Sequence, residues 1–342
     1  MDLFSDNPPN EYFKQFYDDY MGYKNGVEPM IESEIVKELT DKLLKSKNLI
    51  LRGAPGTGKS YLAKAIACNM IGASNEDLES SEQFEFVQFH PNYDYTDFVE
   101  GIRPVISRDG TMGFDLKSGI FKMFCEQALE TQSGNSSDKT SEKHENHIKY
   151  GDNHKKYIFV IDEINRGEIS KIFGELFFSI DPSYRGIAGA VKTQYSNMDS
   201  EKDKFYIPEN VYIIGTMNDI DRSVDTFDFA MRRRFVEIKA NENLEMLDSL
   251  GDDKDEAINR MISLNDAISQ VDELDRNYHI GAAYFLKLKD ISFEELWEDF
   301  LEPLLSDYIR GMFNEEEIME SFKSVYDNPQ ISSELGSEDE VG

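Results

Sequence analysis

The sequence predicts an α/β fold, in which helices cover a parallel β-sheet and a small all-helical domain follows. Short, largely apolar runs typical of buried parallel strands occur at residues 48–51, 157–161 and 211–216. From about residue 240 the apolar residues repeat at helical spacing alone. Because 342 residues are enough for two or three hydrophobic cores, we expect a sheet domain and then a helical domain.

A glycine-rich loop follows the first apolar run. Residues 53–60 fit G-x-x-x-x-G-K-[ST], the pattern of a phosphate-binding loop, and a helical pattern begins directly after it. The glycines allow a tight turn that directs backbone N–H groups at phosphate, and the helix adds the positive end of its dipole. A turn without a ligand is the alternative, which the flanking strand and helix disfavour.

We expect Lys59 to contact the β- and γ-phosphates of a nucleotide and Ser60 to hold Mg²⁺. The full set expected to bind the nucleotide is Gly53, Ala54, Pro55, Gly56, Thr57, Gly58, Lys59, Ser60 and Tyr61.

Polar side chains end the other two apolar runs. Asp162 and Glu163 follow one run and Asn218 follows the other. Because ligands bind at the carboxyl ends of parallel strands, we expect Asp162 to hold Mg²⁺ through water and Glu163 to polarise an attacking water. Asn218 is expected to contact the γ-phosphate or this water. The alternative is that the strands simply stop at polar turns.

Three adjacent arginines, at positions 232–234, stand out in a chain of net charge −31. An arginine placed against a neighbouring subunit's triphosphate would stabilise the charge of phosphoryl transfer. Ion pairing with the surplus carboxylates is the alternative, and we expect one or two arginines in each role.

The composition limits the possible functions. A surface this acidic repels phosphate backbones, which disfavours direct nucleic-acid binding. No apolar run is long enough to span a membrane, and the first residues lack the features of a signal peptide. The two cysteines, Cys68 and Cys125, lie in apolar helical patterns, so we expect core thiols in a reducing cytoplasm.

We expect the chain to consist of four segments. Residues 1–31 are an aromatic and acidic extension, and residues 32–239 contain the nucleotide-binding domain. Residues 240–327 are a helical lid, and residues 328–342 are a disordered acidic tail.

Within the nucleotide-binding domain, we expect a helix at 32–47 with Ile35, Leu39 and Leu43 on one stripe. Further expected elements are a strand at 84–89, a hairpin turning at Asp109-Gly110, a helix at 121–129, and a second hairpin with arms at 190–195 and 204–207. In the lid, one expected stripe is Ala257, Met261, Leu264 and Ile268, and another is Leu296, Phe300, Leu304 and Tyr308.

The polar stretch 131–156 is expected to be a mobile surface insert. It contains His144, His147 and His154, whose spacing matches no tetrahedral metal site. A solvated loop is therefore favoured over a metal site.

In this order, the motifs resemble an AAA+ P-loop NTPase, and more closely the McrB group, the nucleotide-hydrolysing subunits of modification-dependent restriction systems. The resemblance covers about residues 32–310. The stretches that carry it are Val87–Tyr95 with Asp97–Pro104, Asp162–Gly167 with Ile169–Leu176, Pro208–Asn210 with Ile213–Asn218, Asp221–Ser223, and Met231–Phe235.

The resemblance implies an αβα core with hairpin inserts and a helical lid, assembled as a nucleotide-dependent hexameric ring with sites at subunit interfaces. It implies a partner resembling McrC, which carries the nuclease, and a preference for GTP, with ATP as the alternative. It also implies that Asn218 is the polar sensor and that Arg232 and Arg233 act in trans. No guanine-reading [N/T]-K-x-D motif is present, so GTP rests on resemblance alone.

The sequence departs from the family pattern in three places. Asp219-Ile220 stands where the signature usually has Thr-Ala, which adds a carboxylate near the expected site. Ala282 and Ala283 replace polar residues of the lid. The family pattern also includes a domain that reads modified DNA, and we expect none before the motor. Either the subunit is naturally short, or a separate chain reads the DNA, or the chain is truncated, and we expect DNA to be contacted through another domain or chain.

Two other functions stay open on the sequence. One is an ATP-driven remodelling protein of the MoxR-like type, which acts on protein complexes. The other is a nucleotide-bound assembly scaffold with incidental hydrolysis. The first hypothesis remains an Mg²⁺-dependent NTPase that drives a partner nuclease in restriction or phage defence.

Overall fold

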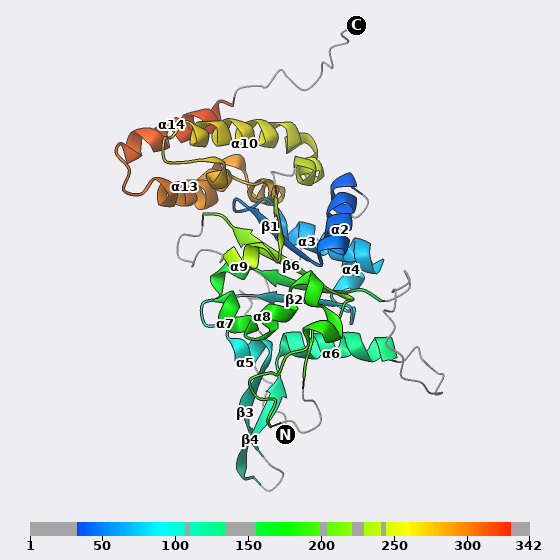
Figure 1. Ribbon diagram of the computed structural model, residues 1–342. Helices are drawn as coiled ribbons and strands as arrows, with labels where there is room; N and C mark the ends of the chain where they lie inside the picture. Colours follow the sequence, from blue (N-terminus) through cyan, green and yellow to red (C-terminus); the bar gives the residue numbers. More distant parts are fainter. Residues whose placement is uncertain are drawn as a thin grey trace. The chain divides into compact units, whose positions relative to one another are not determined.

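The computed structural model describes residues 33–106, 110–133, 155–198, 204–220, 229–240 and 244–329. These residues fall into two units, which divide near residue 241 (Figure 1). The aromatic extension at 1–31, residues 134–154 of the polar insert with its three histidines, Asp221–Ser223, and the tail beyond residue 329 lie outside the described residues.

The first unit is built on a five-stranded sheet of order β2-β5-β6-β1-β7, in which every pairing is parallel. Its strands are β1 (Asn48–Gly53), β2 (Phe84–Gln88), β5 (Tyr157–Asp162), β6 (Val211–Asn218) and β7 (Val236–Lys239). The three central strands are buried almost throughout, which explains their continuous apolar runs. The predicted α/β fold with a parallel sheet is confirmed.

The register of the sheet brings the predicted motifs to one edge. Gly53, the first residue of the phosphate loop, lies opposite Asn218 at the end of β6. Asp162 ends β5, the neighbour of β6 on the other side. Because all these strands run in the same direction, their carboxyl ends carry the loop, the acidic pair and the sensor side by side.

Before β5, the described part of the first unit also contains three longer helices and two single-turn helices, which lie between the sheet strands in the sequence or next to them. They are α2 (Glu34–Ser46), α3 (Lys59–Ile71) and α6 (Ile120–Ser133), with the single-turn helices α4 (Asn75–Leu78) and α5 (Tyr95–Phe98). α2 begins after Ser33, whose hydroxyl accepts a hydrogen bond from the N–H of Val36. The prediction that Ile35 belongs to the buried stripe is wrong. The stripe contains Val36, Leu39, Thr40 and Leu43, which places Ile35 one position off this face, 49% exposed.

Short turns of helix connect β5 to β6 and precede β7. They are η3 (Ile164–Arg166), α7 (Ile169–Phe173), α8 (Leu176–Ser179), η4 (Pro182–Tyr184), η5 (Gly186–Gly189) and α9 (Phe229–Arg232). The expected second hairpin does not form as two strands: in the described residues, only a single bridge joins Val191 and Phe205. The other residues of the two arms lie in turns and irregular structure, so the arms do not form a ladder of paired strand residues.

A predicted hairpin is confirmed as a separate two-stranded sheet. Strands β3 (Glu100–Ile106) and β4 (Met112–Ser118) pair antiparallel, with Ile106 opposite Met112. Alternation places Ile102, Pro104, Ile106, Met112, Phe114 and Leu116 on one face of this ribbon. Residues 107–109 of its turn lie outside the described part.

Aromatic rings fill the core between the sheet and its helices. Phe98 is fully buried, and its ring centroid lies 4.7 Å from those of both Phe121 and Phe173. It also contacts Phe89 and Phe159 edge to face, at 5.7 Å. Phe98 therefore joins the chain after β2 to the helices and to β5. Both cysteines, Cys68 and Cys125, are buried and free, as core thiols should be.

Replacing Phe98 with Ala should lower the free energy of unfolding of this unit by about 3–5 kcal/mol, because it removes a large buried ring and leaves a cavity. Urea unfolding followed by near-UV circular dichroism measures the change. Phe114→Ala is the matched control, since Phe114 is 73% exposed and should cost about 0.5 kcal/mol or less. Equal losses in the two variants would contradict the assignment of Phe98 to the core.

The second unit is helical. Its longer helices are α10 (Lys254–Ser269), α13 (Glu302–Ile309) and α14 (Glu315–Asp327). Shorter turns are η6 (Leu244–Asp253), η7 (Arg276–Tyr278), α11 (Ala282–Phe285), η8 (Leu286–Lys289), α12 (Phe293–Leu296) and the π-helical turn η9 (Trp297–Leu301). The stripe predicted on α10, namely Ala257, Met261, Leu264 and Ile268, is buried as expected.

The other predicted stripe of the lid is only partly right. Leu296 is buried, but Phe300, Leu304 and Tyr308 are half-buried at the margin of the core. Their neighbours Leu301, Leu305 and Ile309 fill the centre instead. The wider π-helical turn at 297–301 shifts the face by about one residue, and an ordinary helical repeat does not anticipate such a shift. Across the described residues, no helix is long and apolar enough to cross a membrane.

Candidate nucleotide-binding site

The phosphate loop joins β1 to α3, and its glycines adopt backbone angles that other residues rarely take. Gly56 and Gly58 have φ angles of 75° and 79°. At Gly53 a side chain would not fit, because a Cβ atom would lie 2.8 Å from the carbonyl oxygen of Ala240. α3 begins after Gly58 with no side-chain cap, which leaves its first N–H groups available to a phosphate. All nine residues predicted to bind nucleotide lie in this loop and the first turn of α3.

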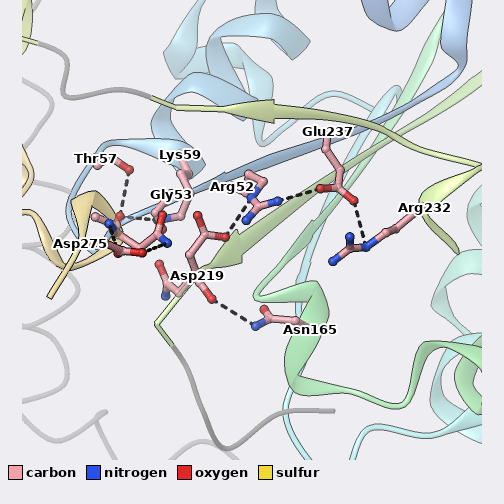
Figure 2. Close-up of polar contacts among 12 residues, drawn as sticks. Arg52, Gly53, Thr57, Lys59, Asn165, Asp219, Arg232, Glu237 and Asp275 are labelled. Carbon is pink, nitrogen blue, oxygen red and sulfur yellow. Dashed lines mark hydrogen bonds and ion pairs between the residues drawn. The ribbon is translucent and has the colours of Figure 1, made fainter. Parts of the chain in front are cut away.

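The side chain of Lys59 lies against the backbone of the phosphate loop (Figure 2). Its ammonium donates to the carbonyl oxygens of Gly53 at 3.1 Å and Ala54 at 2.7 Å. Thr57 closes the same turn by donating to the Ala54 oxygen at 2.9 Å. Burial lowers the pKa of Lys59 to about 8, although nearby carboxylates, Glu163 first among them, oppose this change. A desolvated cation in a glycine loop is well suited to receive a polyphosphate.

Replacing Lys59 with Ala should weaken Mg²⁺-nucleotide binding by about 10- to 100-fold, since a hydrogen bond to a charged group is worth about 1.5–3 kcal/mol. Titration with a fluorescent nucleotide analogue measures the affinity. Lys64→Ala is the matched control, because Lys64 lies on the same helix but pairs with Glu79 at the surface. An affinity of Lys59→Ala equal to that of the control would refute the assignment.

The predicted magnesium residues meet directly. Ser60 Oγ donates to Asp162 Oδ1 at 2.6 Å, although the two residues are 102 positions apart. Thr216 Oγ1 donates to the same carboxylate oxygen, also at 2.6 Å. A serine hydroxyl and a carboxylate are the hard oxygen ligands that Mg²⁺ prefers, and Mg²⁺ keeps several of its own waters. The donor set at this site therefore fits a magnesium ion.

Glu163 and Asn218 also form a pair. The side-chain amide of Asn218 donates to Glu163 Oε1. The backbone N–H of Glu163 donates to Thr216 Oγ1 at 3.1 Å, and the residue adopts the left-handed conformation with φ 50°. Arg166 Nε lies 3.5 Å from the other oxygen, Glu163 Oε2. The hydrogen bond from Asn218 holds this carboxylate beside the end of β6, and the left-handed backbone at Glu163 is the kind of strain that is often found at functional sites.

The three arginines have different environments. Arg234 is buried, its carbonyl accepts a hydrogen bond from Asn48 at 2.8 Å, and its guanidinium stacks 4.2 Å from the Phe177 ring. Arg232 and Arg233 are exposed. Arg232 ends α9, with Nε 3.7 Å from Glu237 Oε1. One arginine is thus part of the core, and the other two are accessible to another chain.

Two contributors to the site were not predicted. Thr216 binds both Asp162 and the backbone of Glu163. It lies two residues before Asn218, and because side chains alternate along a strand, the sequence could have placed it on the same side of β6 as Asn218. Arg52, the residue before the phosphate loop, binds Asp219 and Glu237, which are more than 160 positions away. No local pattern in the sequence indicates that contact.

Comparison with known proteins agrees with this geometry. The family described as AAA domain (dynein-related subfamily) matches residues 48–235, and the McrB alpha-helical lid domain matches residues 256–317. The Type IV methyl-directed restriction enzyme EcoKMcrB subunit of Escherichia coli (strain K12) is 37% identical over 261 residues, 73% of this chain and 49% of that protein. The Type II restriction enzyme BsuMI component YdiS of Bacillus subtilis (strain 168) is 28% identical over 212 residues, 55% of each chain.

Among solved structures, a putative ATPase from Cytophaga hutchinsonii is 12% identical and aligns over 92% of this chain and 86% of its own, with a TM-score of 0.35. The chain spans about half the length of the two relatives that it matches in sequence.

The parallel sheet, the phosphate loop and the match over residues 48–235 define a protein of the AAA+ class. With the matching lid and the identity to the E. coli subunit, the chain belongs to the McrB family.

Proposed function

We propose that the protein is an Mg²⁺-dependent nucleoside triphosphatase and the motor subunit of an McrBC-like restriction or phage-defence complex in the cytoplasm. The observation that carries the proposal is the convergence, at one edge of the sheet, of the Ser60–Asp162 contact and the Glu163–Asn218 pair. Both lie beside the loop that holds Lys59, whose pKa is affected by Glu163 and Asp162.

Each of these side chains has a task in hydrolysis. Lys59 supplies a positive charge for the β- and γ-phosphates. Ser60 and Asp162 offer oxygen ligands for Mg²⁺, which neutralises phosphate charge when it is bound. Glu163 orients a water through its carboxylate, and Asn218 keeps that carboxylate in place by donating to it. The site thus positions and polarises its reactants, which is the main requirement of phosphoryl transfer.

The finer parts of the proposal concern assembly and specificity. We infer a homo-oligomeric ring, a hexamer by family resemblance, in which exposed Arg232 or Arg233 completes the site of a neighbouring subunit. GTP is the proposed substrate, on the same resemblance. A nuclease subunit of the McrC type is the proposed partner, and the names of the two relatives as restriction components support it. DNA would be contacted through another domain or chain, which agrees with the net charge of −31.

The test is phosphate release from GTP and ATP in parallel, with Mg²⁺, over a range of protein concentrations and with the candidate nuclease subunit added. Light scattering on the same samples measures the oligomeric state. A GTP preference and a rate per subunit that rises with concentration and with the partner are expected. An ATP preference without a response to the partner would favour a remodelling ATPase, and tight binding without hydrolysis would favour a scaffold.

A further inference from the structure

One cation joins three strands of the sheet directly before the phosphate loop. Arg52 is in β1, and its Nε donates to Asp219 Oδ1 at 3.0 Å, just beyond the end of β6. Its Nη1 donates to Glu237 Oε2 at 3.0 Å, in β7. Because β6 and β7 flank β1 on opposite sides, the guanidinium bridges both neighbours of the strand that carries the loop (Figure 2).

Asp219 is also tied to the loop by its backbone. Its N–H donates to the carbonyl oxygen of Gly53 at 3.3 Å, and the same oxygen accepts a hydrogen bond from the ammonium of Lys59 at 3.1 Å. The Asp219 side chain is only 3% exposed, and its Oδ2 is buried without a hydrogen-bond partner among the described residues. A buried carboxylate needs a cation nearby, and Arg52 supplies it.

The position of Asp219 determines that of its neighbour. Asn218 precedes it in the chain, donates its side-chain amide to Glu163, and accepts a hydrogen bond at its carbonyl from Asn165 at 3.4 Å. Without Arg52, the charge of Asp219 would add to those of Asp162 and Glu163 near the same lysine, and the three carboxylates would repel one another. The end of β6 would then move away from the loop and carry the Asn218 amide with it.

We propose that Arg52 is a positioning residue, which binds Asp219 and Glu237 together and so holds Asn218 against Glu163 beside the phosphate loop. Its role in hydrolysis rests on the proposed function, whereas its role in fixing the strand end does not require nucleotide. Arg52 acts through Asn218 and Glu163 and has no chemical step of its own.

The first measurement is amide hydrogen exchange of the nucleotide-free protein, followed by mass spectrometry on peptides that contain Asp219. Arg52→Gln should raise the exchange rate at the end of β6 about tenfold, because local opening no longer breaks a charged hydrogen bond. Arg52→Lys, which keeps the charge, should restore part of the protection. Arg310→Gln is the matched control: it removes an arginine that pairs with Asp307 on the exposed lid surface, and it should change nothing at β6.

A double-mutant cycle identifies the partner. Asp219→Asn alone should also speed exchange. Arg52→Gln combined with Asp219→Asn should be no worse than the more severe single variant, because both changes remove the same Arg52–Asp219 contact. Strictly additive effects, or unchanged exchange in Arg52→Gln, would overturn the proposal.

Kinetics separates positioning from a general loss of stability. In Arg52→Gln, kcat should fall about tenfold while KM stays within about threefold, because phosphate contacts remain and the water is less well oriented. Equal kcat in Arg52→Gln and wild type would refute the positioning role, even with altered exchange. If wild type hydrolyses neither GTP nor ATP, the proposed function fails, and the exchange data alone decide whether Arg52 fixes the strand end.

Discussion

Replacing Glu163 with Gln is expected to lower kcat for nucleotide hydrolysis by about 10²–10⁴-fold and to leave nucleotide affinity within about threefold. Gln has the same shape and keeps an oxygen that accepts the hydrogen bond from Asn218. The backbone contact between Glu163 and Thr216 does not involve the side chain and should persist. The negative charge that polarises water is lost, together with the ion pair to Arg166 at 3.5 Å. Because the phosphate loop is intact, the largest effect should fall on the chemical step.

Single-turnover phosphate release measures that step, and titration with a fluorescent nucleotide measures binding. Glu168→Gln is the matched control, since Glu168 is exposed and pairs with Lys171 at the surface. If Glu163→Gln hydrolysed nucleotide at the wild-type rate, the group that orients the water would be another residue. A loss of binding as large as the loss of rate would show that the carboxylate serves nucleotide binding instead.

Removing both exposed arginines, Arg232 and Arg233, is expected to reduce hydrolysis in the assembled protein by about 10³-fold, the scale of an arginine that stabilises charge in phosphoryl transfer. Nucleotide affinity of isolated subunits should change little, because the loop residues are intact. Arg103→Ala is the control, since Arg103 is an exposed arginine on the β3–β4 hairpin that pairs with Asp97.

Mixing two inactive variants tests whether these arginines act between subunits. Glu163→Gln subunits keep the arginines, and subunits with Arg232→Ala and Arg233→Ala keep Glu163. A complete site forms where a Glu163→Gln subunit contributes its arginines to a neighbouring subunit that keeps Glu163. The mixture should therefore recover a measurable share of wild-type activity. A mixture as inactive as its components would exclude action in trans.

Much of the site could be predicted because its residues lie in contiguous patterns. The loop at 53–60 combines its glycines, lysine and serine within eight residues, and Asp162-Glu163 directly follows a run of buried apolar residues. The parallel direction of the strands then brings their ends together, and the contact between Ser60 and Asp162 follows from that rule. Errors arose where one helical repeat was extended too far, as at Phe300 and Leu304 beyond the π-helical turn.

Apolar periodicity and local motifs report on backbone structure. For this reason the residues alone predict the parallel sheet, the phosphate loop and the acidic strand end. The pairing of charges, in contrast, is visible only in the three-dimensional arrangement. Asp219 appeared as an extra carboxylate near the site, and Arg52 neutralises it from 167 positions away. Likewise, Arg234 is buried whereas Arg232 and Arg233 are exposed, although the three are adjacent. Such pairings depend on strand order and register, which bring together residues that no local pattern connects.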